Sequence, residues 1–281
     1  MASKRSSCKK RQRGKWFMHA KFNLNPGREK WSEYMSIGES IHGENKKIVK
    51  NKLDEFKSAN GVLQAEGIIK NWFPKIHADV FLSHSHKDEQ LITGLAGWLK
   101  YEFQITSFID SAVWGYADNL LRVIDDNFCK KTSDKYYNYN LRNRSTSHVH
   151  MLLSTALFEM IDRCECIIFV NTPNSFVSID SLNKNGKTES PWIYSEIAMT
   201  RLIRQRSPAD HRPKMAMDSV GASLEDISES RQLRISYPAD LFHLTELSEY
   251  DLTCWKNKEN LNRSKYPLDS LYEMKRVKNV N

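Results

Sequence analysis

Hydroxyl, imidazole and amine side chains follow a short apolar run near residue 80. Val80–Leu82 is apolar, and Ser83, His84, Ser85 and Lys87 come directly or shortly after it. In open α/β sheets, ligand-binding groups lie at the carboxyl ends of strands. The serines and the histidine can contact ribose or phosphate through hydroxyl and backbone N–H groups, and Lys87 can pair with a pyrophosphate. A capping or turn role accounts for the serines and the histidine equally well.

Two acidic residues further along the chain, Asp110 and Glu196, are also expected near the carboxyl ends of strands. Asp110 ends the apolar stretch 105–110, where acids bind ribose in nucleotide-binding folds; ending the strand is an equally good explanation. Glu196 lies in the second turn of a helix predicted to start at Ser190 and Pro191, since serine favours the N-cap and proline the first helical position. Its carboxylate can face the crevice at the strand ends, or it can be a solvated glutamate favoured by the helix dipole.

The elements that must position these residues alternate between strand and helix. Apolar spacing predicts a strand at 78–82, a helix at 89–103 capped by Asp88 or a nearby serine, and a strand at 105–110. Such a βαβ unit pairs its strands in parallel, with a right-handed crossover. Further patterns predict a helix at 151–161, a strand at 164–170, a helix from 190 to about 206, a strand at 233–236 and a helix at 248–255.

Two additions flank or interrupt this pattern. Residues 16–75 are amphipathic in places and are expected to form a helical N-terminal extension packed against the main domain, ending before Pro74. The polar stretch at about 130–147 is expected to be an insertion loop. The expected divisions are a basic disordered tail at 1–15, the extension at 16–75, and a domain at 76–281 with its core at 78–206 and further elements at 207–281.

Charge and composition narrow the class of protein. The net charge is +8, and seven basic residues without an acid lie in the first fifteen positions, so the tail carries most of it. A folded nucleic-acid-binding face is therefore not indicated. With 281 residues, five cysteines in no disulfide pattern and no recognisable signal peptide, the chain is expected to be cytoplasmic. No apolar run is long enough to span a membrane.

A metal site is disfavoured. His148 and His150 precede Cys164 and Cys166, but a His-x-His pair shares a face only in a strand. The cysteines fall in a predicted buried strand, where a free thiol behaves as a small hydrophobic group. Neither a metal nor a cofactor is expected.

The sequence resembles the bacterial Toll/interleukin-1 receptor (TIR) domain family over roughly residues 78–206. Four boxes in the family's order carry the resemblance. They are Asp79–Asp88, Ser107–Asp110, Cys166–Val170 with Ser175, and Ser190–Ile197. The resemblance implies an α/β fold with a flavodoxin-like parallel sheet and helices on both faces.

The resemblance also implies an activity. Many TIR domains cleave NAD⁺ with a glutamate that corresponds to Glu196, and bacterial members act in anti-phage defence by depleting NAD⁺ or by making an ADP-ribose signal, cyclic or linear. NAD⁺ would then be the substrate, with a homo-oligomer on activation and an effector reached through the nucleotide signal. Ser83, His84, Ser85, Lys87, Asp110, Trp114, Tyr116 and Trp192 are the candidate substrate-binding residues.

The segment around Trp114 departs from the family. Trp114 and Tyr116 lie where the family has its mobile BB loop, but the usual Pro-Gly pair is missing, which puts loop-mediated assembly in doubt. These aromatic rings can stack on nicotinamide or adenine, or they can serve in packing.

Two functions of different classes remain open. One is an NAD⁺-cleaving enzyme, and the other is a non-catalytic TIR adaptor that works by assembly. Glu196 favours the enzyme, since an adaptor needs no acid at that position. A nucleotide-binding receptor is less favoured, because the chain has no Gly-rich phosphate loop.

Overall fold

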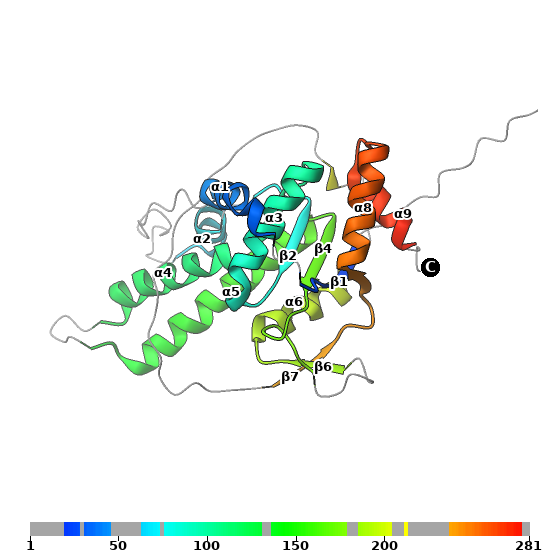
Figure 1. Ribbon diagram of the computed structural model, residues 1–281. Helices are drawn as coiled ribbons and strands as arrows, with labels where there is room; N and C mark the ends of the chain where they lie inside the picture. The colour runs from blue at the N-terminus through cyan, green and yellow to red at the C-terminus, as the bar shows by residue number, and fades with distance from the viewer. Residues whose placement is uncertain are drawn as a thin grey trace, which may run out of the picture.

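A five-stranded parallel sheet forms the centre of the protein (Figure 1). The computed structural model describes residues 20–28, 31–45, 63–73, 76–130, 136–178, 185–203, 211–212 and 236–276. The strands follow the order β3-β2-β4-β1-β8, and every neighbouring pair is parallel. Their bounds are β1 Ala20–Asn25, β2 Val80–Ser83, β3 Ser107–Ile109, β4 Cys166–Val170 and β8 Thr245–Ser248.

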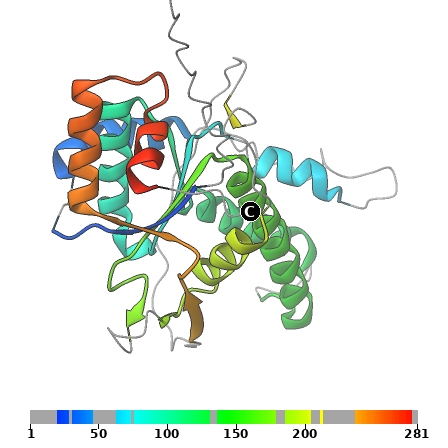
Figure 2. The ribbon, with the colours of Figure 1, turned by 90° about the vertical axis from the view of Figure 1, so that its right-hand side faces the viewer.

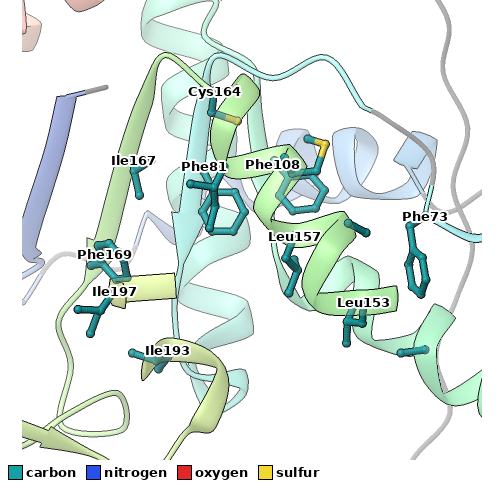
Figure 3. Packing of buried hydrophobic residues seen from close by; sticks show 14 of the residues in the cluster. Phe73, Phe81, Phe108, Leu153, Leu157, Cys164, Ile167, Phe169, Ile193 and Ile197 are labelled. Carbon is teal, nitrogen blue, oxygen red and sulfur yellow. The ribbon is translucent and has the colours of Figure 1, made fainter. Parts of the chain in front are cut away.

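Helices cover both faces of the sheet, which confirms the predicted α/β class. Figure 2 shows α3 (Glu89–Phe103), α8 (Glu249–Leu261) and α9 (Pro267–Lys275) on one side, with α5 (Tyr139–Arg163) and α6 (Pro191–Leu202) on the other. Alternate residues of each strand point to opposite faces of the sheet and pack against the helices there, since both faces of a parallel sheet are buried. Phe81, Phe108, Ile167 and Phe169 pack towards α5 and α6 (Figure 3), whereas Val80, Leu82, Cys166 and Ile168 pack towards α3, α8 and α9.

The first strand corrects the prediction of a helical extension at 16–75. Residues 20–25 form β1, which lies inside the sheet between β4 and β8. In a flavodoxin-like order this place belongs to the fourth strand of the chain. Phe22 and Leu24 are fully buried on one face, and their two-residue period is too short to stand out beside the helical spacing further on. The segment is therefore part of the domain.

The rest of the extension is mainly helical where the structure describes it, with a turn at 27–28. Helix α1 (Met35–Asn45) packs on α3, and α2 (Ala65–Trp72) packs on α5. Helix α2 ends at Trp72, before Pro74 as predicted. The basic tail at 1–15 and the amphipathic residues between 46 and 62 lie outside the described residues.

The insertion expected at about 130–147 is a loop for only part of its length. Helix α5 starts at Tyr139, much earlier than predicted, and forms a hairpin with α4 (Ser111–Phe128) that Figure 1 shows reaching away from the sheet. The Asn138 side chain caps α5 by accepting a hydrogen bond from the Leu141 N–H at 3.2 Å. Ser145 is buried there and donates to Asp125 of α4. The polar composition of this stretch reflects exposed helix faces, not a loop.

The remaining elements agree with the predictions in type. Helix α3 has the predicted bounds, and α8 begins after Ser248, whose hydroxyl accepts from the Asp251 N–H at 3.2 Å. The strand predicted at 233–236 falls mostly outside the described residues. The strand β7 (Tyr237–Asp240) follows it and pairs antiparallel with β6 (Asn185–Thr188), which in turn pairs with β5 (Val177–Ser178). Among the described helices, none combines the length and the apolar character needed to cross a bilayer.

Two glycines let α1 lie unusually close to α3. A methyl group added at Gly38 would lie 2.0 Å from the Thr93 carbonyl oxygen, and one at Gly97 would lie 2.1 Å from the Tyr34 carbonyl oxygen. The obstructing atoms are backbone atoms, which cannot rotate away. The packing of the N-terminal segment on the domain therefore depends on these two positions.

We expect Gly97→Ala to lower the free energy of unfolding by about 1–3 kcal/mol, because the clash with Tyr34 forces the helices apart. Helix propensity alone would favour alanine by about 1 kcal/mol, so the sign of the change separates the two effects. Urea titration followed by circular dichroism measures it. Gln90→Ala, at an exposed position of the same helix, is the control, and a variant Gly97→Ala as stable as the wild type would contradict the close packing.

Candidate functional site

Three of the predicted site residues come from three different elements at one edge of the sheet. Ser83 is the last residue of β2, Asp110 follows β3, and Glu196 lies in the second turn of α6. Helix α6 starts as predicted, with Pro191 in its first turn and the Ser190 hydroxyl accepting from the Ile193 N–H at 3.2 Å.

Helix α6 points Glu196 towards the sheet. Its neighbours Ile193 and Ile197 are buried and belong to the same apolar cluster as Phe169 of β4 (Figure 3). Glu196 itself is only 1% exposed. The carboxylate lies against the end of β2, as predicted, and is almost fully enclosed.

Ser83, His84, Asp110 and Glu196 form a buried carboxyl cluster. The Ser83 hydroxyl donates to Glu196 Oε2 at 2.6 Å, and His84 Nδ1 lies 2.7 Å from Asp110 Oδ1. Asp110 also contacts the Glu196 carboxyl group. All four residues are buried. The sequence proposed each of them as a site residue, and the structure brings them together.

Burial changes the protonation of this cluster. Removal from water, followed by the negative charge of Asp110, raises the pKa of Glu196 well above its ordinary value, and the hydrogen bond from Ser83 only partly opposes this. The protonated form of Glu196 is therefore favoured in the folded protein. Burial lowers the pKa of His84, but the charge and hydrogen bond of Asp110 outweigh it, so the net shift is upward. Together the four side chains form an enclosed polar group.

The other predicted site residues lie around the cluster or outside it. Ser85 and Trp192 are half-buried, and the Trp192 ring lies 5.6 Å from the His150 ring between centroids. Lys87 is exposed. The backbone of Trp114 and Tyr116 is helical within α4, where the TIR family has its BB loop. Their side chains lie outside the described part of the structure.

A second polar group was only partly anticipated. Asp88 was expected to cap α3, but its side chain makes no cap; it accepts instead from the Thr172 hydroxyl at 2.5 Å and from the Asn174 amide at 2.7 Å. These contacts join the segment after β2 to the segment after β4. The polar residues after β4 indicated in the sequence that this strand end carries hydrogen-bonding groups. The sequence did not show that their partner is Asp88.

A pocket of about 710 Å³ opens beside this second group. Among the predicted site residues, only Lys87 lines it. Ser83, Asp110 and Glu196 are absent from its walls, so the carboxyl cluster is enclosed separately. Its lining residues are Asn25, Pro26, Gly27, Arg28, Ser32, Met35, Lys87, Asp88, Gln90, Leu91, Asn171, Thr172, Pro173 and Asn174.

The residues considered for a metal site do not converge. His148 and His150 are exposed on α5, whereas Cys164 and Cys166 are buried at and before β4. Burial raises the pKa of both thiols. Within the described ranges, no three histidine, cysteine or acidic side chains gather as a metal site.

Comparisons with known proteins leave the chain without an assigned family. No protein-family model matches it, and neither a curated protein nor a solved structure is significantly similar to it. The chemistry must therefore be argued from the site itself.

We expect Glu196→Gln to stabilise the protein, by on the order of 1 kcal/mol near pH 8. Between the ordinary carboxyl pKa of 4.5 and the raised folded pKa, the folded state holds a proton that the unfolded state has released, so wild-type stability falls as pH rises. Glutamine removes this dependence. The pKa of His84 is also raised, so His84 makes both the wild type and the variant less stable as pH rises.

Thermal unfolding from pH 5 to pH 9 tests this expectation. The difference in stability between Glu196→Gln and the wild type should grow with pH. Glu66→Gln, on an exposed position of α2, should show no such trend. A difference that is constant with pH would mean that Glu196 does not hold a proton in the folded state.

Proposed function

We propose that this protein is an enzyme that cleaves the nicotinamide N-glycosidic bond of NAD⁺, with Glu196 as the catalytic residue. The observation that carries the proposal is the buried carboxyl pair of Glu196 and Asp110 at the carboxyl ends of parallel strands. Enclosing two acids is unfavourable for folding, and such arrangements concentrate at functional sites. The resemblance to TIR domains supplies the reaction.

The chemistry of this bond suits a single working carboxylate. The nicotinamide nitrogen is positively charged in NAD⁺, so the bond between it and ribose C1′ breaks with its electron pair going to nicotinamide. No acid is needed to protonate the leaving group, unlike ordinary glycoside hydrolysis, which uses two carboxyl groups. Ionised Glu196 stabilises the ribosyl cation or holds the ribose hydroxyls. Water then adds to C1′ and releases a proton, or adenine of the same molecule closes a ring.

The enclosure of Glu196 supports a latent enzyme. In the conformation described, Glu196 is buried and protonated against Asp110, and it does not line the pocket. Activation then requires that substrate or self-association open the cluster. Latency suits a role in anti-phage defence in the cytoplasm, because uncontrolled loss of NAD⁺ would poison the host. A homo-oligomer on activation and an effector that senses the product belong to the same proposal.

Release of nicotinamide from NAD⁺ tests the proposal. Purified protein is incubated with NAD⁺ alone and with lysate of phage-infected cells, and the products are followed by chromatography and mass. Wild type should release nicotinamide and Glu196→Gln should lose at least about a hundredfold in rate, because the group that stabilises the cation becomes neutral. Asp110→Asn should retain more activity, since Asp110 does not itself need to be charged.

The controls separate catalysis from folding and from assembly. Glu66→Gln should match the wild type. Equal release by wild type and Glu196→Gln would show that Glu196 is not catalytic. Absence of release under activating conditions, together with binding to another TIR domain, would favour the adaptor function.

A further inference from the structure

The pocket lies beside the place in the sheet where the direction of the strand order reverses, between β2 and β4. Its walls come from the segments that follow β1, β2 and β4, which are adjacent parallel strands. The chain leaves β2 towards α3 on one face and leaves β4 towards α6 on the other. Open α/β sheets bind their ligands in the crevice that such diverging connections leave.

Two cationic side chains face this pocket, Arg28 after β1 and Lys87 after β2. Neither forms an ion pair with a carboxylate among the residues that the structure describes. The Glu249 carboxylate accepts from the Arg28 backbone N–H at 3.4 Å, which is a contact with the main chain and not with the guanidinium. The positive charges of both side chains are therefore available to a ligand.

The carboxylate that lines the pocket is already hydrogen-bonded. Asp88, the single carboxylate in the lining, receives the Thr172 hydroxyl on one oxygen and the Asn174 amide on the other. The Asn25 side-chain carbonyl accepts from the Gly27 N–H at 3.0 Å, which leaves its NH₂ group as a donor. The first turn of α3 also borders the pocket through Gln90 and Leu91. The pocket therefore presents two positive charges and side-chain N–H groups beside one hydrogen-bonded carboxylate.

We propose that this pocket binds the diphosphate group of a small phosphorylated molecule, of the nucleoside diphosphate class. Its volume, about 710 Å³, lies within the range typical of small-molecule sites. Arg28 offers a planar guanidinium for two phosphate oxygens, and Lys87 offers a point charge. Binding at this pocket does not depend on NAD⁺ cleavage by Glu196. The diphosphate can belong to NAD⁺ itself or to a separate regulatory nucleotide.

Isothermal titration at low ionic strength, with inorganic pyrophosphate and with ADP, tests the proposal on the full chain. Both should bind wild type saturably at one site. Arg28→Gln and Lys87→Gln should each weaken binding about tenfold, and the double variant should weaken it more. Gln90→Trp keeps the charge and fills the pocket, and it should also abolish binding. Circular dichroism confirms that each variant is folded.

Matched controls distinguish a built site from general charge attraction. Lys70→Gln on α2 and Arg144→Gln on α5 remove one exposed positive charge each, away from the pocket, and should bind as wild type does. Lack of saturable binding by wild type, or equal weakening by the control variants, would overturn the proposal.

A competition arm identifies the source of the diphosphate. Glu196→Gln, which is expected to leave NAD⁺ intact, should bind pyrophosphate as wild type does even if the enzymatic proposal fails. Displacement of pyrophosphate by NAD⁺ in this variant would place the substrate's own diphosphate in the pocket. Displacement by ADP but not by NAD⁺ would identify a separate nucleotide.

Discussion

The contact between the carboxyl groups of Glu196 and Asp110 is the constraint around which the rest of the site is arranged. Burial and the negative charge of Asp110 both disfavour the ionised form of Glu196. Ser83 donates to one acid and His84 pairs with the other. Each partner sits where a strand ends, and only the parallel order of β2 and β3 brings those ends to the same edge. The apolar packing of α6 on β4 offsets the cost of keeping the pair dry.

The N-terminal strand links the stability of the sheet to the pocket. Strand β1 lies between β4 and β8, so without it β8 would lose its pairing with the rest of the sheet. The same strand leads directly into Asn25 and Arg28, which line the pocket. Helix α1 then returns along α3, at a distance that only Gly38 and Gly97 permit. A segment more than fifty residues before β2 is thus both a structural and a pocket-lining part of the domain.

Local signals in the sequence predicted the elements that carry the cluster, and long-range packing decided the rest. Apolar spacing of three to four residues predicts helix α3, and Ser190 with Pro191 predicts the start of α6. Both signals act between residues about one helical turn apart. Strand β1 has six residues and gains its stability from two neighbouring strands, which no local pattern reveals. The start of α5 was missed because its polar residues face solvent. The choice of Thr172 and Asn174 as partners of Asp88 is set by the sheet order alone.

The enclosed cluster and the open pocket are electrostatically connected. Asp88 lines the pocket and its charge also helps to raise the pKa of His84, the partner of Asp110. In the proposed reaction, the ribose hydroxyls of the substrate would replace the contacts that Ser83 and Asp110 now make with Glu196. Hydroxyl groups that donate to the carboxylates favour their ionised forms. A ligand that interacts better with the opened cluster than with the closed one shifts the population towards the opened form. In the proposed reaction, the proton on Glu196 would therefore pass to solvent water in the step that opens the cluster to the substrate.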